Sequence, residues 1–253
     1  MNESDTALRY TAFPETAFVL ASRPDRHYAL RYWSPSDEVP FCGHATVATA
    51  TALAERDGVG TMVFETQAGE VAIAATADDS GAITVAFTSV EPYVRDLDAD
   101  LLDRLLELLG LFREDLDPKF PVKEAFAGNL HPVLTLKDVE IFHQFRFAPK
   151  PLSDLMRQQG WKGTVVVLHE AGPGEFLARN LFPTGRFTED PATGSGAAAV
   201  GAYLRSIGQA APGTTIRIHQ GAHVGRPSLL TVTIPAQGGI TVSGTAARIH
   251  PEE

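Results

Sequence analysis

The residues best suited to proton transfer in this chain lie in three short segments. In the first, Glu15 is a single carboxylate at the entrance to an apolar stretch. His44 lies in the second segment and Asp190 in the third, and small apolar residues follow both. Burial raises the pKa of a carboxyl group, and histidine titrates near neutrality, so these side chains could exchange protons with a substrate near pH 7. The alternative role for an isolated acid such as Glu15 is a structural salt bridge.

The third segment reads E-D-P-A-T-G-S-G over residues 189–196. Proline disfavours helix at the residue before it, so we predict a helix from about residue 193, with free N–H groups and the positive end of its dipole at its start. Gly194 allows close approach there, and the hydroxyl of Ser195 could hold a small anion. The alternative is a turn that caps a core helix, with Asp190 as the cap. Asp190 is preferred to Glu189 as an acid or base because it lies nearer the turn.

The second segment reads F-C-G-H over residues 41–44 and starts a similar run of small residues. We predict that Gly43 and His44 lie at a second helix start, in the positions that Gly194 and Ser195 hold at the first. The positive end of a helix dipole favours the neutral form of a histidine, which suits proton relay. A purely structural hydrogen bond is the alternative role for His44.

The sequences around these two helix starts are related. R-Y-W-S-P at residues 31–35 precedes Gly43 as R-N-L-F-P at residues 179–183 precedes Gly194, and a leucine lies ten residues beyond each glycine. A repeat of this length is too long for a solenoid and indicates two similar lobes. If a pseudo-twofold axis relates them, the helix starts face each other across a cleft, where ligands often bind.

The predicted elements give an α+β protein of two pseudo-symmetric lobes, each an antiparallel sheet or barrel wrapped around a central apolar helix. Strands are predicted at residues 11–20, 27–33, 61–66, 71–76, 83–87, 122–126, 132–136, 165–168, 176–181, 215–219, 229–234 and 240–242. Helices are predicted at residues 45–54, 101–111, 152–159 and from 193 to about 208. Pro118 and Pro121 mark a linker, so the lobes are assigned to residues 1–116 and 117–253.

The composition excludes several classes of protein. The net charge is −10 without a Lys/Arg-rich run, which argues against a nucleic-acid partner. The longest apolar stretches are shorter than the ~20 residues that a membrane span needs. The acidic N-terminus argues against a secretory signal, so we expect a cytoplasmic protein. One cysteine, Cys42, excludes an intramolecular disulfide and a two-thiol catalytic pair.

We expect neither a cofactor nor a metal. Gly172-Pro173-Gly174 lacks the third glycine of a dinucleotide-binding loop, and the chain contains no phosphate-binding G-x-x-x-x-G-K-[ST] motif. His219 and His223 are four residues apart, but the intervening Gln220-Gly221 indicates a strand end and a turn rather than one helical face.

Three blocks together resemble the phenazine-biosynthesis PhzF-like family, which has the diaminopimelate epimerase fold. They are E-T-A-F-V at residues 15–19, P-F-C-G-H-A-T at 40–46 and E-D-P-A-T-G-S at 189–195. A fourth block, from Gln220-Gly221 to residues 225–228, matches the family near the C-terminus. Their order and spacing cover nearly the whole chain.

The resemblance implies two lobes around a cleft, a frequent homodimer, and functional roles for four residues. The family's acid–base glutamate falls on Glu15, its histidine on His44, its aspartate on Asp190 and its serine on Ser195. Family members usually begin with a strand and a Phe-x-Gly-Asn-Pro motif, which this sequence lacks. We therefore expect the N-terminal lobe to be truncated by its first strands and helix, which would expose a sheet edge.

The leading hypothesis is a cofactor-independent isomerase that moves a proton between carbons of a small, anionic, carboxylate-bearing metabolite. Glu15 would carry the proton, His44 and Asp190 would orient or relay it, and Gly43, Gly194 and Ser195 would bind the anion. The alternative is a non-catalytic ligand-binding or dimer-forming protein of the same fold. A serine hydrolase is less favoured, because G-x-S-x-G requires glycine where Thr193 stands.

Overall fold

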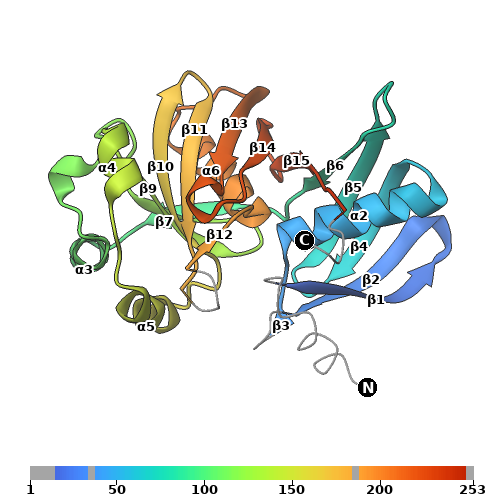
Figure 1. The fold of residues 1–253 in the computed structure, drawn as a ribbon, viewed down its shortest axis with the longest axis horizontal. Helices are drawn as coiled ribbons and strands as arrows, with labels where there is room; N and C mark the ends of the chain where they lie inside the picture. Colours follow the sequence, from blue (N-terminus) through green and yellow to red (C-terminus); the bar gives the residue numbers. More distant parts are fainter. Residues whose placement is uncertain (1–14, 34–37, 184–187, 249–253) are drawn as a thin grey trace.

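The computed structural model describes residues 15–33, 38–183 and 188–248, and these form two halves with the same order of elements (Figure 1). The N-terminal half contains β1 (Thr16–Arg23), β2 (His27–Trp33), β3 (Glu38–Val39), α2 (Gly43–Asp57), β4 (Gly60–Thr66), β5 (Gly69–Ala77) and β6 (Ile83–Thr88). The corresponding elements of the C-terminal half are β10 (Val165–Gly172), β11 (Glu175–Leu181), β12 (Glu189–Asp190), α6 (Gly194–Ser206), β13 (Thr214–Gln220), β14 (Ser228–Ile234) and β15 (Thr241–Thr245).

Strand pairing repeats in the two halves, which confirms the predicted duplication. β1 pairs antiparallel with β2, and β10 pairs antiparallel with β11. β3 and β12 then pair with those second strands. The helix that follows returns the chain to a parallel strand, so β2 pairs with β4 as β11 pairs with β13. The sheets are therefore mixed rather than purely antiparallel as predicted, because each helix crosses over between two strands that run in the same direction.

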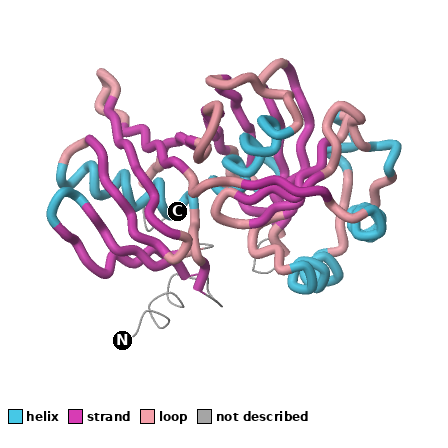
Figure 2. The backbone as a smooth tube through the Cα atoms, turned by 180° about the vertical axis from the view of Figure 1, so that it is seen from behind, coloured by secondary structure: helices cyan, strands magenta, loops and turns pink. Residues whose placement is uncertain are grey.

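The halves are joined through their last strands. β6 pairs antiparallel with β15, from Thr88↔Thr241 to Thr84↔Thr245. This pairing makes one 15-stranded sheet that runs from β1 at one edge to β7 at the other (Figure 2). The sequence predicted a separate sheet for each lobe, whereas the two lobes share one continuous sheet.

The segment between β6 and β10 packs with the C-terminal half. This part contains β7 (Tyr93–Asp96), α3 (Ala99–Leu109), β8 (Lys123–Phe126), β9 (Leu130–Thr135), α4 (Val139–Gln144) and α5 (Pro149–Gln159). β7 pairs with β8, and leucines of α3 and α5 share one buried cluster. We therefore propose a boundary near residue 90 in place of the predicted one after residue 116. Phe120, between Pro118 and Pro121 of the predicted linker, is buried, which supports this proposal.

The central helix of the C-terminal half, α6, lies among the strands of that half (Figure 1). Every residue from Gly194 to Leu204 is buried. A Cβ at Gly201 would lie 2.7 Å from the Ile240 side chain, so the small residues of α6 allow the strands to pack directly against it, as predicted. Among the described helices, none has the length and apolar content to cross a bilayer.

Neighbouring elements cover the two faces of the sheet near β10. Val166 and Leu168 point into the cluster around α6, whereas Val165 and Val167 point into the cluster of α3 and α5. β1 is the corresponding strand of the N-terminal half, and it forms the edge of the described sheet. The predicted loss of earlier strands concerns residues 1–14, which lie outside the described residues.

Candidate functional site

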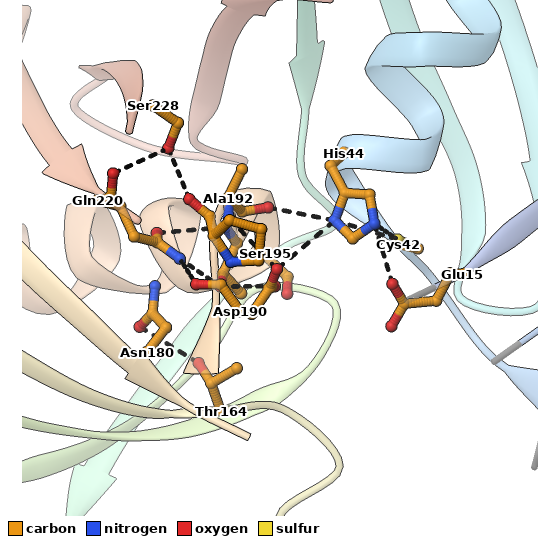
Figure 3. A network of polar contacts seen from close by, with 12 residues as sticks. Glu15, Cys42, His44, Thr164, Asn180, Asp190, Ala192, Ser195, Gln220 and Ser228 are labelled. Atoms are coloured by element: carbon orange, nitrogen blue, oxygen red, sulfur yellow. Dashed lines mark hydrogen bonds and ion pairs between the residues drawn. The ribbon is translucent and has the colours of Figure 1, made fainter. Parts of the chain in front are cut away.

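The six residues singled out from the sequence line a single pocket between the halves. Its size is about 420 Å³, counted with its open mouth. Glu15, Gly43 and His44 come from the N-terminal half, and Asp190, Gly194 and Ser195 come from the C-terminal half. Figure 3 shows these polar side chains converging from both sides. The duplication therefore builds the pocket from two equivalent segments of the chain.

These segments correspond residue by residue. E-V-P-F-C-G-H-A at residues 38–45 and E-D-P-A-T-G-S-G at residues 189–196 each cross from a two-residue strand into a helix. The strand pairings Trp33↔Glu38 and Leu181↔Glu189 give the same alignment. His44 and Ser195 thus hold equivalent positions in the first turns of α2 and α6, as predicted.

The two helix starts are in direct contact, and the pocket lies beside the contact. A Cβ on Gly43 would lie 2.6 Å from the Cα of Gly194, so glycine is required for this approach. The N–H groups of each first turn have no acceptor within their own helix. Two positive dipole ends therefore meet at the wall of the pocket and favour a bound anion.

Glu15 and His44 form an ion pair within the N-terminal half. The distance from Glu15 Oε2 to His44 Nε2 is 2.9 Å, and only 10% of the Glu15 side chain is exposed. The other ring nitrogen, Nδ1, is 3.3 Å from the carbonyl oxygen of Ala192 and 3.9 Å from Asp190 Oδ1. His44 therefore connects the acid of one half to the turn of the other.

The surroundings of His44 favour its protonated form. Burial acts to lower the pKa of His44, but Cys42, Glu15 and Asp190 beside the ring raise it well above its ordinary value. Burial also raises the pKa of the Cys42 thiol to about 11, so that thiol is neutral near pH 7. The two carboxylates are thus the groups that stabilise the imidazolium. The prediction of a neutral His44 is wrong, because these carboxylates outweigh the helix dipole.

Asp190 and Glu189 have separate environments. Glu189 forms a buried ion pair with Arg179 at 2.6 Å and does not line the pocket. Asp190 lines the pocket and accepts a hydrogen bond from the hydroxyl of Thr193 at 2.8 Å. Gln220 supports this turn by donating to the carbonyl oxygen of Asp190 at 2.6 Å. Asp190 is therefore both a cap of the turn and a pocket carboxylate.

Two polar side chains contact the hydroxyl of Ser195. His131 Nε2 is 3.2 Å from Ser195 Oγ, and the side-chain amide of Asn129 donates to the same oxygen at 3.3 Å. The backbone N–H of Thr164 donates to His131 Nδ1 at 2.9 Å. The carbonyl oxygen of Thr164 lies 3.0 Å from the same nitrogen, so Nδ1 has both a donor and an acceptor beside it. Ser195 Oγ therefore accepts a hydrogen bond from Asn129 and exchanges one with His131.

Comparison with known proteins shows the family of this chain. A family model described as phenazine biosynthesis-like protein, PhzC-PhzF, matches residues 7–250. The chain belongs to this family. An isomerase of Salmonella typhimurium, YddE, described as uncharacterized, is 30% identical over 94% of this chain and 83% of its own. The trans-2,3-dihydro-3-hydroxyanthranilate isomerase of Pseudomonas chlororaphis is 29% identical over 85% of this chain and 73% of its own.

The fold of the PhzF-like family is also the fold observed here. A phenazine biosynthesis protein of the PhzF family from Bacillus anthracis superposes with a TM-score of 0.82 at 22% identity. That match covers 99% of this chain and 88% of the other chain. The likeness establishes the mixed α+β architecture over nearly the whole length.

The sequence analysis missed His131 and Asn129 of this PhzF-like site. His131 is fully buried, and burial lowers its pKa to about 4, so the ring is neutral near pH 7. Gly163 packs against the ring, since a Cβ there would lie 2.4 Å from it. The sequence did contain one signal for them, because Asn129 and His131 come just before an apolar run, as Glu15 does. Nothing in their spacing, however, relates them to Ser195, which lies in another element.

The contacts of His131 also test the serine hydrolase hypothesis. A catalytic base must accept the proton of the serine hydroxyl through an unprotonated nitrogen. In a catalytic triad, a carboxylate orients that base. Among the described residues, the partner of His131 Nδ1 is Thr164 and not a carboxylate, so the Ser195–His131 contact lacks this third group.

The two histidines considered for a metal are not brought together. His219 pairs with Glu175 at 2.9 Å, whereas His223 Nε2 lies 3.2 Å from His143 Nδ1. Within the described residues, the group of three metal-ligating side chains is Glu15, Cys42 and His44, whose ligand atoms all lie within 4.8 Å of one another.

Proposed function

We propose that this PhzF-like protein is an isomerase that moves a proton between two carbons of a small metabolite bearing a carboxylate. The observation that carries the proposal is the meeting of the Glu15–His44 ion pair with two helix starts and the Ser195 hydroxyl in one pocket. One side of the pocket thus offers a proton acceptor, and the other offers donors for an anion. The names of the curated relatives, which include isomerases, support the same reaction class.

In this mechanism the carboxylate of Glu15 removes a proton from a carbon of the substrate and returns it to another. The imidazolium of His44 holds the carboxylate through Nε2 and donates through Nδ1 toward Ala192. Asp190 keeps the ring charged from the other half. An acid or base positioned in this way typically contributes about 10²- to 10⁴-fold to the rate.

The substrate carboxylate binds at the contact between Gly43 and Gly194. The N–H groups of the two first turns and the hydroxyl of Ser195 donate to it. Loss of a proton from carbon adds negative charge to the substrate, and fixed donors stabilise that charge without reorganising. His131 and Asn129 act as positioning residues, because both contact Ser195 Oγ.

Proton exchange in D₂O tests the proposal. Small chiral or unsaturated carboxylates are incubated with the protein, and deuterium uptake at carbon is followed by mass spectrometry. The panel includes trans-2,3-dihydro-3-hydroxyanthranilate, the compound in the name of the Pseudomonas chlororaphis relative. We expect uptake into at least one compound, with a loss of 10²-fold or more in Glu15→Gln.

Glu70→Gln is the matched control, because Glu70 is exposed on β5 and is not among the residues that line the pocket. It should exchange deuterium at the wild-type rate. Full activity in Glu15→Gln would refute the role of Glu15. A folded wild-type protein that binds one of the acids but catalyses no exchange would favour the non-catalytic binding protein instead.

A homodimer and a cytoplasmic location remain part of the proposal, the first from the family resemblance and the second from the sequence. Light scattering on a size-exclusion column would measure the mass in solution against the 27.2 kDa of one chain. A mass near twice that value is expected, and a monomer at all working concentrations would remove the dimer from the proposal.

A further inference from the structure

We propose that Lys162 binds a second anionic group of the substrate, so that the pocket takes a small dianion with a carboxylate at one end and a further carboxylate or a phosphate at the other. This inference rests on the proposed function, which places the first carboxylate at Gly43 and Gly194. Lys162 lines the same pocket. Since the chain carries a net charge of −10 and repels anions, a lysine here shifts the local charge in favour of one.

Lys162 differs from the other charged residues of the pocket lining in having no partner within the described part of the chain. Glu15, His44 and Asp190 bind one another across the two halves. The Lys162 side chain is exposed, and it forms no ion pair or hydrogen bond with the described residues. Its ammonium group is therefore available to a ligand.

The uncharged polar side chains that share this wall with Lys162 are already bound to protein groups. Apart from Ser195, which the proposed function assigns to the first carboxylate, these side chains are Asn129, His131, Thr164 and Thr193. Lysine offers three N–H donors and no acceptor. Lys162 can thus donate to a second anionic group without breaking a contact inside the protein.

The backbone of Lys162 is held from both sides. Trp161 is buried, and its indole N–H donates to a buried carboxylate at 2.5 Å. On the other side, Gly163 packs against the ring of His131, and the N–H of Thr164 donates to His131 Nδ1 at 2.9 Å. The flexible four-carbon side chain of the lysine therefore starts from a fixed point at the pocket wall.

Lys162 and Glu15 belong to different halves of the molecule. By strand register, Thr164 holds in the C-terminal half the position that Glu15 holds in the N-terminal half, and Lys162 lies two residues before it. The first carboxylate binds where the two halves touch. A substrate held at both charged ends would present the carbons between them to Glu15.

Calorimetric titration of the full chain tests the inference without reference to catalysis. The probes are pairs of compounds that differ in the charge of one end: succinate with succinamate, L-malate with its 4-amide, and 3-phosphoglycerate with glycerate. We expect the dianion of at least one pair to bind about 10-fold more tightly than its partner, as is typical of a hydrogen bond to a charged group. A preference in the first two pairs identifies a carboxylate, and a preference confined to the third identifies a phosphate.

The ratio of the two affinities within a pair should fall to about one in Lys162→Gln and persist in Lys162→Arg, which keeps the charge. A variant that merely disturbs the pocket would weaken both members of a pair and leave the ratio unchanged. Lys150→Gln is the matched control, because Lys150 is 87% exposed on α5 and does not line the pocket. Equal affinities within every pair in the wild type, or a preference that survives Lys162→Gln, would overturn the inference.

The deuterium-exchange assay separates this inference from the proposed function. For a dianion that exchanges, Lys162→Gln should raise KM about 10-fold with little change in kcat, whereas Glu15→Gln should lose kcat. Exchange confined to monoanions would overturn the dianion site. If the wild type catalyses no exchange but still prefers dianions through Lys162, the proposed function fails and the dianion site stands.

Discussion

Strands β1 and β10 hold the same place in the two halves of the molecule, yet their surroundings differ. Leu168 of β10 is fully buried between the helix-covered faces of the sheet. Its counterpart by strand register, Val19 of β1, is 44% exposed. β10 has β9 as a parallel neighbour, whereas β1 ends the described sheet. The same backbone pattern is thus stabilised by a deep core in one half and by far less burial in the other.

The pocket-facing positions of the two halves differ in chemistry instead. Val39 corresponds to Asp190, Cys42 to Thr193 and His44 to Ser195. In our proposal the N-terminal half supplies the proton carrier and the C-terminal half supplies the anion donors. A duplicated scaffold can therefore keep its backbone contact at Gly43 and Gly194 while the side chains on either side take different tasks.

An ion pair is also duplicated. Arg179 of β11 pairs with Glu189 of β12, and Arg31 of β2 pairs with Glu38 of β3 at the equivalent positions. The Arg179 side chain is 5% exposed and also donates to the carbonyl oxygens of Phe142 and Phe145. The Arg31 side chain is 38% exposed. The two pairs give a direct way to measure what burial contributes.

The largest effect is expected from Arg179→Met. It leaves Glu189 buried without its partner, which should lower the free energy of unfolding by about 3–5 kcal/mol. Arg31→Met, in the half-exposed pair, should cost no more than about 1 kcal/mol. Urea denaturation measures both. The double variant Arg179→Met/Glu189→Leu should recover much of the loss, because it removes the unpaired charge. Equal effects of the two single variants would contradict the difference in burial.

Much of the fold could be predicted from the sequence because its signals are local. Most strands were predicted within a few residues, and the helix at residues 101–111 corresponds to α3, whose ends are set by Asp98 as cap and Gly110 in the left-handed region. The related stretches before Gly43 and Gly194 predicted the duplication. The joining of β6 to β15 could not be predicted in this way, because strand pairs far apart in the sequence leave no local pattern.

The residues of the candidate site also divide into those that local sequence could identify and those that it could not. Glu15, His44, Asp190 and Ser195 could be singled out because they lie beside turns and helix starts with recognisable sequence. His131 could not, since its importance comes from a contact with Ser195 across 64 residues of chain. The charge of His44 was predicted wrongly for a related reason. Its pKa depends on carboxylates brought from two other segments rather than on its own helix.

The second effect is a loss of folding stability of about 3 kcal/mol as the pH falls, caused by the buried His131. Its pKa is about 4 in the folded protein, against about 6.5 in the unfolded chain. Below pH 6.5 the unfolded chain binds a proton that the folded protein does not, so the contribution to stability is present above pH 6.5 and is lost as the pH falls toward 4. Urea denaturation of the wild type between pH 7 and 4 should show this loss, and His131→Gln should show a shallower one. Identical pH slopes would contradict a buried neutral ring.

The third effect is expected at the contact between the two halves. In Gly43→Ala the new methyl carbon would lie 2.6 Å from Gly194 Cα, which is backbone and can move only if the two helices separate. Overpacking of this kind typically costs about 1–3 kcal/mol of stability. Gly172→Ala is the matched control, since Gly172 has nothing within 4 Å of an added Cβ and no positive φ. Urea denaturation should separate the two variants.

Because the contact also places the donors of both helix starts, Gly43→Ala should weaken binding of the substrate carboxylate more than its small loss of stability would suggest. A Gly43→Ala protein with the stability and binding of the control would mean that the two halves can shift at this contact without consequence for the pocket.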